Sequence, residues 1–408
     1  MRVLSAIGPG DVVAAYRDWQ GNVRTLLETS ITFSSQEFEF FKRHGIAFWA
    51  ISSAPNAALR IDGENRIENR PRATTRPVSG LAFHTVQLLY ALSLWISALR
   101  FRATHAVVDS GTTHWFALVA LRLSGITVVP NFHNTYWPAG HPPDGLAKRA
   151  ILWLDQTFFR LGVKAALGVS PECGRQVAQL SSSRSQYFDY RAQFPASEFM
   201  ELPKPVSPGK HVRVMFAGRV EESKGVFDLL KVCKLLSEDE ERDFVFEVCG
   251  HGSASEKLAV LVQAQQMGER FVLRGNLGRK DLLAVYARSH VVVVPTRSDF
   301  IEGLAMVCAE AMLAGRPVVT SKLVPALELM RGCALEAREE DPADYARQIR
   351  AVVSDSDRYQ AMVRATTECG RQFVDGVLGL DVVLERCLCP GEAGGGAQAP
   401  DRRGGINA

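Results

Sequence analysis

Residues 291–320 read VVVVPTRSDFIEGLAMVCAEAMLAGRPVVT, and this stretch decides the fold class of the chain. A run of four valines ends at Pro295, and a polar loop follows it. A helix-forming stretch then opens at Gly303, and Gly315 together with Pro317 ends it. Because apolar runs and glycine or proline punctuation separate secondary structure elements, this order predicts a strand, a loop, a helix and a second strand.

Two glutamates frame the start of this predicted helix. Glu302 ends the loop, and Glu310 follows eight residues later within the helix. At about 1.5 Å per helical residue the two carboxylates lie roughly 12 Å apart, which is too far for them to share a proton. The spacing instead favours a long ligand along the helix start, with a hydroxyl-bearing group near each glutamate. The unpaired backbone N–H groups of residues 303–306 would face a negatively charged middle part of that ligand.

The length and composition of the chain limit the class of protein. A chain of 408 residues exceeds one ordinary core and predicts two domains of similar size. Hydrophobic content of 47% and charged content of 22% are typical of a soluble globular protein. A net charge of +3 without clustered Lys and Arg does not favour a nucleic-acid partner. Eight cysteines without a CxxC pair indicate reduced core residues of a cytosolic protein, not disulfides or a zinc site.

Short apolar strands alternate with amphipathic helices across the second half of the chain, and the first half repeats this pattern less regularly. Such alternation predicts parallel sheets covered by helices on both faces, with ligands at the carboxyl ends of the strands. We therefore predict an α/β fold with two Rossmann-like, doubly wound parallel-sheet domains that face each other across a cleft. The predicted parts are a first domain (1–195), a linker (196–210) that overlaps the Ser- and Pro-rich stretch 181–208, a second domain (211–375), a segment (376–389) with the option of returning to the first domain, and a disordered tail (390–408).

Two basic residues follow the first strand of the second domain in the sequence FAGRVEESKG, residues 216–225. Gly218 permits a tight exit from the strand, so that Arg219 and Lys224 are placed at the carboxyl edge of the sheet. Two cations at this edge favour a diphosphate, which Arg contacts as a planar fork and Lys as a point charge. The alternative is that both are solvated loop charges paired with the two glutamates of the same loop.

Several motifs occur in a fixed order between residues 212 and 349, namely FAGRVEESKGVFDLL, CGHG, RGNL, VVVVPTRSDFIEG and CAEAMLAGRPVVTS. Together they resemble the nucleotide-sugar half of the retaining glycosyltransferases of family 4, which are of the glycosyl transferases group 1 type and have the two-domain GT-B fold. The resemblance includes the E-x(7)-E pair of that family, here Glu302 and Glu310. The first half is similar only in outline, through a glycine loop near its start and a histidine after an inner strand.

The resemblance implies a role for each matching residue. Arg219 and Lys224 would stabilise the diphosphate of the donor. Glu302 would bind hydroxyls of the transferred sugar, and Glu310 would bind the ribose. His133 matches the histidine that reaches the sugar from the acceptor domain, with a purely structural role as the alternative. The further donor-binding positions are Gly218, Gly303, Leu304, Ala305, Gly8, Gly10 and Gly250.

The chain departs from the family pattern directly after the first glycine of the helix entry. Leu304 stands where the family usually has an aromatic residue, and Ala305 stands where it usually has glycine. The methyl group of Ala305 would lie where backbone and ligand approach closely, so we expect the detailed geometry to differ at this point.

By this resemblance we expect a retaining, hexosyltransferase-type enzyme that moves a sugar from a nucleoside diphosphate sugar to an acceptor hydroxyl, in polysaccharide or glycoconjugate synthesis. The acceptor would attack from the front face, and the departing phosphate would take its proton. No metal and no other cofactor is expected, because the cations at the diphosphate are side chains. The alternatives are a nucleotide-sugar epimerase of the same fold and a non-catalytic partner subunit that binds nucleotide.

Two apolar stretches of the first half allow alternative interpretations. Residues 81–101 are the most apolar stretch and predict either a buried helix or a marginal membrane span. Residues 146–161 combine Lys148 with Trp153 and predict either a membrane-surface face or a core helix with solvated basic residues. The sequence does not open on a signal peptide pattern. We therefore expect a cytoplasmic protein, with peripheral contact at the inner face of the membrane as an option.

Overall fold

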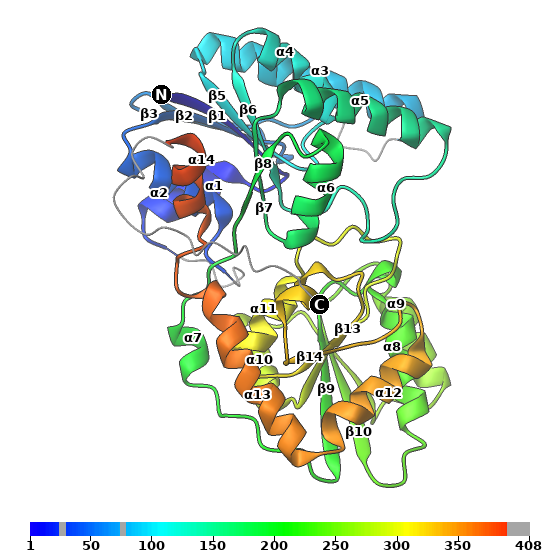
Figure 1. Ribbon diagram of the computed structural model, residues 1–408. Helices are drawn as coiled ribbons and strands as arrows, with labels where there is room; N and C mark the ends of the chain where they lie inside the picture. The colour runs from blue at the N-terminus through cyan, green and yellow to red at the C-terminus, as the bar shows by residue number, and fades with distance from the viewer. Residues whose placement is uncertain (24–29, 74–78, 390–408) are drawn as a thin grey trace, which may run out of the picture.

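The computed structural model describes residues 1–23, 30–73 and 79–389. These residues form two α/β domains, which lie one above the other in Figure 1, each around its own sheet. The predicted α/β class with two parallel-sheet domains is therefore confirmed. The predicted tail, 390–408, lies outside the described residues.

The N-terminal domain contains an eight-stranded sheet with the order β3-β4-β2-β1-β5-β6-β7-β8. Neighbouring strands are parallel, except that β3 and β4 pair antiparallel at one edge. Central strands such as β1 are buried on both faces, as a sheet covered by helices on both sides requires. The strands are β1 (Arg2–Ile7), β2 (Ala47–Ser52), β3 (Ala58–Asp62), β4 (Asn65–Asn69), β5 (His105–Asp109), β6 (Thr127–Phe132), β7 (Ala165–Gly168) and β8 (Gln186–Asp189).

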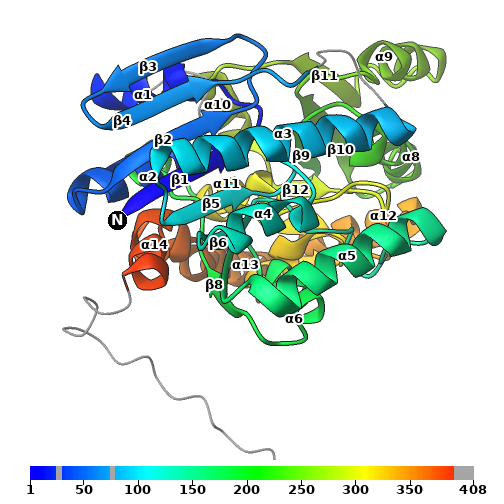
Figure 2. The same cartoon turned by 90° about the horizontal axis from the view of Figure 1, so that it is seen from above.

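Two groups of helices pack on this sheet. In the first group α2 contacts both α1 and α14, and in the second α3, α4, α5 and α6 contact one another in a row. Figure 2 shows the second group from above, with α3, α4 and α5 as the outer layer of the domain. The helices are α1 (Val12–Gln20), α2 (Phe33–Arg43), α3 (Gly80–Phe101), α4 (Val119–Leu123), α5 (Leu146–Gly162), α6 (Pro171–Ser181) and α14 (Leu380–Leu388), with a 3-10 turn η1 (Trp115–Leu118) before α4.

The C-terminal domain contains a six-stranded sheet, parallel throughout, with the order β11-β10-β9-β12-β13-β14. The four-valine run is β12, the fully buried strand that this run predicts. The strands are β9 (His211–Ala217), β10 (Asp243–Cys249), β11 (Phe271–Gly275), β12 (Val291–Val294), β13 (Val318–Thr320) and β14 (Ala334–Glu336). The helices are α8 (Val226–Leu236), α9 (Ser255–Ala264), α10 (Arg279–Arg288), α11 (Met306–Leu313), α12 (Pro342–Val353) and α13 (Ser356–Gly370), with 3-10 turns η2 (Glu222–Lys224), η3 (Pro325–Leu329) and η4 (Arg371–Phe373).

The helix that carries Glu310 begins later than the sequence predicts. The prediction opens this helix at Gly303, whereas α11 begins at Met306. Ala305 precedes it with a φ of 69°, in the left-handed region that residues with a β-carbon rarely adopt. The backbone from Gly303 to Ala305 is therefore a strained turn before the helix, not its first turn.

The predicted linker is also shorter than the Ser- and Pro-rich composition suggests. Residues 186–189 within the stretch 181–208 form β8, the last strand of the N-terminal sheet. A short helix, α7 (Ser197–Met200), then forms inside the predicted linker 196–210, and its residue Phe199 is buried. Composition alone misses these elements because each contains only four residues.

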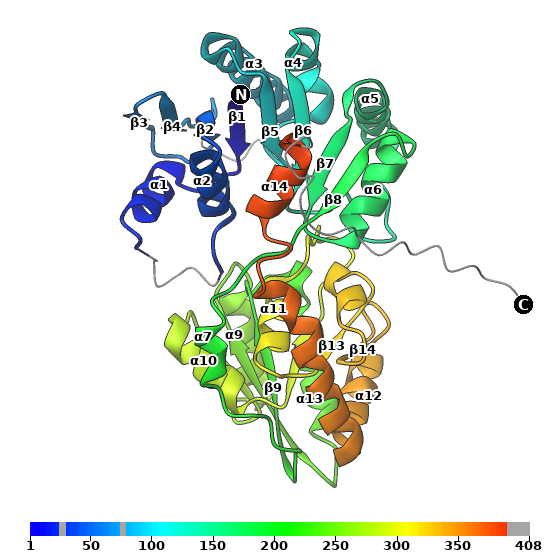
Figure 3. The ribbon, with the colours of Figure 1, turned by 60° about the vertical axis from the view of Figure 1, so that its left-hand side comes forward.

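The chain crosses between the domains a second time near its C-terminal end. The segment 376–389 leads from the C-terminal domain into α14, which packs against α2 of the N-terminal domain. Arg43 and Asp381 form an ion pair of 2.8 Å in this contact. The two crossings lie side by side, because Arg191 N–H donates to the carbonyl of Leu378 at 2.7 Å. Figure 3 shows α14 among the strands and helices of the N-terminal domain.

The two apolar stretches of the first half form α3 and α5. Each helix is partly buried and partly exposed, so neither is simply a buried core helix. In the described part of the chain, α3 is the one helix that is long and apolar enough to cross a membrane, and 33% of its apolar window is buried. Its residues Tyr90, Leu94 and Ala98 are buried in the domain core. In α5, Phe158 and Phe159 are buried as a core helix requires, while other apolar residues of the same helix are exposed.

Candidate active site

Glycines allow two loops of the C-terminal domain to lie against each other at the carboxyl edge of its sheet. Gly218 follows β9 with a φ of 150°, and Gly250 follows β10 with a φ of 136°, so both adopt conformations that favour glycine. A β-carbon on Gly250 would overlap the carbonyl oxygen of Gly218. The structure thus brings these two predicted donor-binding glycines together. The backbone conformation explains why both positions are glycine, and at Gly250 the close approach of Gly218 is a second reason.

Both predicted diphosphate-binding cations lie over one aromatic ring. The Nζ atom of Lys224 is 3.7 Å from the ring centroid of Phe300, and the Cζ atom of Arg219 is 5.3 Å from it. Cations are attracted to the negative face of such a ring, so Phe300 holds the two positive charges on one side of the loop. Sequence reasoning missed Phe300, although it lies two residues before Glu302 in the same polar loop.

The two cations differ in their partners and their exposure. Lys224 is mostly buried and forms an ion pair of 2.5 Å with Glu302. Arg219 is 60% exposed and forms an ion pair of 2.9 Å with Glu221 of its own loop. The predicted alternative of solvated loop charges thus describes the present contacts of Arg219, but not those of Lys224.

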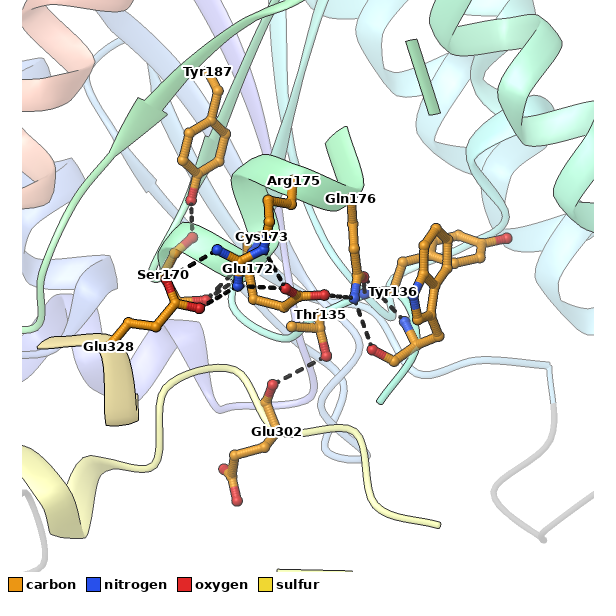
Figure 4. A network of polar contacts seen from close by, with 11 residues as sticks. Thr135, Tyr136, Ser170, Glu172, Cys173, Arg175, Gln176, Tyr187, Glu302 and Glu328 are labelled. Carbon is orange, nitrogen blue, oxygen red and sulfur yellow. Dashed lines mark hydrogen bonds and ion pairs between the residues drawn. The ribbon is translucent and has the colours of Figure 1, made fainter. Parts of the chain in front are cut away.

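Glu302 lies at the junction of the two domains. Its Oε2 atom accepts hydrogen bonds from Lys224 at 2.5 Å and from the hydroxyl of Thr296 at 3.3 Å. Its backbone carbonyl accepts a hydrogen bond of 3.0 Å from Thr135 of the N-terminal domain, which Figure 4 shows. In the same view Arg175 of α6 forms an ion pair with Glu328 of the C-terminal domain. The loop that carries Glu302 is therefore fixed from both domains.

The residues that follow Glu302 are packed into the junction. Gly303 lies against the backbone of His133, and Leu304 and Ala305 are buried. The predicted backbone donors of Leu304 and Ala305 thus belong to the strained turn before α11 and not to the helix itself. The positions remain next to the Lys224–Glu302 pair, as the resemblance implies.

His133 is the centre of a buried polar cluster at the carboxyl end of β6. Its Nε2 atom lies 3.0 Å from Asp109, and its Nδ1 atom lies 3.0 Å from the hydroxyl of Tyr190. The ring of Phe33 stacks on the imidazole with centroids 4.7 Å apart. Burial lowers the pKa of His133, but the charge and the hydrogen bond of Asp109 outweigh it, so the pKa is raised overall.

A second buried carboxyl group belongs to this cluster. Glu37 of α2 accepts a hydrogen bond of 2.6 Å from the hydroxyl of Ser5 on β1. Burial, together with the nearby charge of Asp109, raises the pKa of Glu37 to about 8. Sequence reasoning missed Glu37, because a glutamate in an amphipathic helix is usually solvated and only the fold brings α2 over β1 and β5.

Glu310 is enclosed by partners that sequence reasoning missed. It is 4% exposed, and its carboxylate oxygens accept hydrogen bonds of 2.5 Å from Arg279 and 2.9 Å from Tyr286. Arg279 also pairs with Glu198 of α7 at 2.8 Å, so one guanidinium joins two carboxylates. Burial raises the pKa of Glu310, while Arg279 and Tyr286 act in the opposite direction.

The predicted glycine loop at the start of the chain lies apart from this packing. Gly8 and Gly10 follow β1, and a β-carbon on either would meet no atom within 4 Å. Neither glycine is therefore required by a close approach within the protein. Asp11 directly after them caps α1 by accepting from the N–H of Ala14 at 2.8 Å.

A cavity of about 640 Å³ opens at the domain junction, lined by residues of the N-terminal domain and by Ser298, Asp299 and Ile301 of the loop that leads to Glu302. Its wall contains Ile301, the neighbour of Glu302, and the stacked imidazoles of His84 and His114, whose centroids are 5.1 Å apart. Trp137 and Lys148 add an aromatic and a basic side chain. The mixture of flat rings and hydrogen-bonding groups is typical of ligand sites.

The arrangement of the His, Cys, Asp and Glu side chains determines whether the described residues meet the requirements of a metal site or of a disulfide. Within residues 1–23, 30–73 and 79–389, no group of three or more His, Cys, Asp or Glu side chains is placed to hold a metal ion. All eight cysteines belong to the described residues, no disulfide joins them there, and five of them are buried.

Comparison with known proteins agrees with this geometry. Residues 200–368 match the family described as glycosyl transferases group 1. The match falls on the C-terminal domain. The group 1 type predicted from the sequence is thus confirmed, whereas the assignment to family 4 stays a prediction.

Two curated relatives resemble the group 1 domain in sequence. A 2-deoxystreptamine glucosyltransferase of Streptomyces kanamyceticus is 29% identical over 163 residues, which are 38% of this chain and 39% of that protein. A D-inositol 3-phosphate glycosyltransferase of Corynebacterium kroppenstedtii is 26% identical over 169 residues, or 39% of this chain and 37% of that protein. The match thus spans about two fifths of the length of these relatives.

Solved structures resemble the whole chain in fold. A sucrose-phosphate synthase of Thermosynechococcus elongatus has a TM-score of 0.71 at 14% identity and covers 96% of this chain and 99% of its own. HepE of Anabaena, solved in complex with UDP, has a TM-score of 0.65 at 13% identity and covers 96% of this chain and 100% of its own. The predicted GT-B arrangement of a group 1 domain and a second Rossmann-like domain is therefore confirmed.

Proposed function

We propose that this protein is a retaining glycosyltransferase that moves a hexose from a nucleoside diphosphate sugar to the hydroxyl group of an acceptor. The observation that carries this proposal is the 2.5 Å pair of Lys224 and Glu302 at the domain junction, on a loop that touches His133. The group 1 family match and the glycosyltransferase names of both relatives support sugar transfer. The UDP in the HepE structure supports a nucleoside diphosphate as the leaving group.

The diphosphate binds to Lys224 and Arg219 beside the ring of Phe300. As the bond between the anomeric carbon and the phosphate oxygen breaks, negative charge grows on the diphosphate. Cations that are already in place stabilise this charge more in the transition state than in the ground state. Arg219 is exposed and forms an ion pair with Glu221 of its own loop, so it can turn towards the ligand without leaving a buried charge behind.

Glu302 binds hydroxyl groups of the transferred sugar. A carboxylate can accept about four hydrogen bonds, and the two described above use its Oε2 atom. The contact with Lys224 fixes the orientation of this carboxylate. The sugar therefore lies near Glu302 and His133, because the backbone of His133 contacts Gly303, the residue after Glu302.

His133 donates a hydrogen bond to the sugar from the acceptor side after one of its ring nitrogens leaves its present partner, Tyr190 at Nδ1 or Asp109 at Nε2. Asp109 raises its pKa and orients its ring, so the imidazole carries a proton more often at neutral pH than a free histidine does. The acceptor lies in the 640 Å³ cavity next to Ile301. Its hydroxyl oxygen bonds to the anomeric carbon, and its proton passes to the departing phosphate.

The ribose of the donor binds at Glu310, as the family resemblance implies. Because Arg279 and Tyr286 already bond to this carboxylate, ribose hydroxyls have to share it with Arg279 or displace that guanidinium. Binding of the nucleotide is thereby coupled to α7, which holds the same arginine through Glu198.

A panel of nucleoside diphosphate sugars tests the proposal. Donors that bind should raise the melting temperature, because a ligand that binds only the folded state stabilises it. With the donors that pass this screen, release of nucleoside diphosphate is measured with and without candidate acceptors, and the anomeric configuration of the product is read by NMR. Inversion would refute retention, and donor isomerised without acceptor would show an epimerase instead.

Lys224→Ala is the matching variant, and Lys234→Ala, an exposed lysine of α8, is its control. Loss of one transition-state contact of this kind typically lowers the rate by about 100- to 1,000-fold. We expect this loss in Lys224→Ala alone, with an unchanged circular dichroism spectrum. Equal turnover in both variants would refute the diphosphate site. Failure of the wild type to bind any donor would refute the proposed glycosyltransferase activity.

A further inference from the structure

The outer layer of the N-terminal domain presents an apolar surface that nothing in the described chain covers. Helix α3 packs one side on the domain core and turns a second row of large apolar residues to solvent. These residues repeat with helical spacing and are between 38% and 82% exposed, namely Leu81, Leu88, Leu89, Leu92, Ile96 and Leu99. An amphipathic core helix has polar residues on this side, so the apolar row predicts a partner.

The neighbouring helices extend this surface. In α5, Leu146, Trp153 and Leu161 are 88%, 61% and 72% exposed, and Leu123 at the end of α4 is 83% exposed. Helix α4 contacts both α3 and α5. Figures 1 and 2 show the three helices together at the end of the molecule that faces away from the C-terminal domain. We call this surface the α3–α5 face.

The exposed charges on the three helices of the α3–α5 face have one sign. Residues 80–164 contain seven Lys and Arg but three Asp and no Glu, although the whole chain is nearly balanced at 47 basic and 44 acidic residues. Two of these aspartates, Asp109 and Asp155, are buried. On the three helices themselves the exposed charges are Arg100, Arg122, Lys148, Arg149 and Arg160, all basic.

We propose that the α3–α5 face docks on the surface of a membrane that contains anionic lipids. Apolar side chains enter the boundary between headgroups and acyl chains, Trp153 lies at that boundary, and the basic residues bind lipid phosphates. A protein partner would also cover apolar residues, but the complete lack of exposed acids on three helices matches an anionic surface. Helix α3 lies on the membrane and does not cross it, because Tyr90, Leu94 and Ala98 hold it on the domain core.

The dimensions agree with surface docking. Helix α3 has 22 residues and is about 33 Å long, and α5 has 17 residues and is about 26 Å long. Two such helices side by side form a broad platform. Removal of apolar side chains from water favours binding in proportion to the area buried, so even partial insertion of several side chains supports reversible attachment.

Co-sedimentation of the full chain with vesicles tests the proposal. We expect binding to phosphatidylcholine vesicles with phosphatidylglycerol, weaker binding to pure phosphatidylcholine, and weakening by salt. Leu88→Glu and Trp153→Glu should each reduce binding by about tenfold or more, because each places a charge in the apolar boundary. The matched control is Val260→Glu, a 66% exposed apolar residue of α9 in the other domain.

Three outcomes would overturn the proposal. One is no sedimentation of the wild type with anionic vesicles, and another is equal loss in Val260→Glu. The third is a wild-type dimer that Leu88→Glu converts to monomer without any vesicle binding, which would make this face a contact between two copies. Should a glutamate variant fail to fold, quenching of tryptophan fluorescence by brominated lipid decides the matter, because it should diminish in the conservative variant Trp153→Phe.

Discussion

The backbone of Gly303 lies directly against the carbonyl oxygen of His133, so that a β-carbon on Gly303 would overlap this oxygen. Gly303 follows Glu302 of the C-terminal domain, and His133 directly follows β6 of the N-terminal domain. The two domains thus touch at the backbones of two candidate site residues. Glycine is required there by this approach and not by its backbone angles, since its φ is not positive.

Gly303→Ala should therefore move the Glu302 loop of the C-terminal domain away from His133 of the N-terminal domain and lower the rate of sugar transfer. The added methyl group pushes the Glu302 loop away from His133, and misplacement by about 1 Å can lower an enzymatic rate about 100-fold. Turnover of the donor is the measurement, with Gly268→Ala as the control. Gly268 lies in the same domain, and a β-carbon there meets no atom within 4 Å. Wild-type turnover in Gly303→Ala would show that the domains need not approach this closely.

Arg279→Ala should destabilise the protein. The change leaves the buried carboxylate of Glu310 without its cation and also removes the partner of Glu198. Breaking one side of a buried ion pair typically costs roughly 3–5 kcal/mol, because the other charge stays buried. Chemical unfolding measures this cost, and Lys280→Ala, at the exposed neighbouring position of α10, should cost little. Equal stabilities of the two variants would contradict the ion-pair network.

Glu37→Gln should change how the stability depends on pH. The pKa of Glu37 is raised from 4.5 to about 8, so the folded state holds a proton that the unfolded state releases. The contribution of Glu37 is thus fully present below about pH 4.5 and is lost as pH rises through 8. The variant should gain stability relative to the wild type over this window, by up to about 1.4 kcal/mol per pH unit. Glu39→Gln, an exposed glutamate of α2, should show no such trend.

Asp109→Asn should lower the pKa of His133. Without the carboxylate, burial dominates and favours the neutral imidazole. Because the wild-type pKa is raised, this interaction stabilises the protein fully below the unfolded pKa of about 6.5, and the effect is lost as pH rises through the folded value. NMR titration of the histidines measures the shift, with His105 at the other end of β5 as an internal reference. An unchanged His133 would contradict the assigned pair.

Much of the C-terminal domain could be predicted from the sequence, because its strands are continuous apolar runs such as β12. The edge strand β3 of the N-terminal sheet could not be predicted in this way. Strand β3 alternates between half-buried and exposed residues and carries Arg60 and Asp62, so it lacks the apolar run that marks a buried strand. Strand β14 has three residues, too few for any periodicity.

The candidate site divides in the same way. Arg219, Lys224 and Glu302 could be identified because a short loop places each next to a strand end. Arg279 could not, since it meets Glu310 only after α10 and α11 have packed, 31 residues apart in sequence. The sequence predicts a change of geometry at Ala305 but not its φ of 69°, because residues with a β-carbon rarely adopt this conformation.

The side-by-side crossings of the chain between the domains have a mechanical consequence. Two backbone segments, joined by the hydrogen bonds of Arg191 to Leu378 and of Phe194 to Phe373, connect the two bodies at one edge. Two adjacent backbone connections allow the domains to bend about this edge as a hinge, but they restrict rotation of one domain relative to the other. When the domains open for the exchange of ligands, the gap between them should therefore be widest on the side farthest from this edge. On closure, the site loops of the two domains should return to the same relative position.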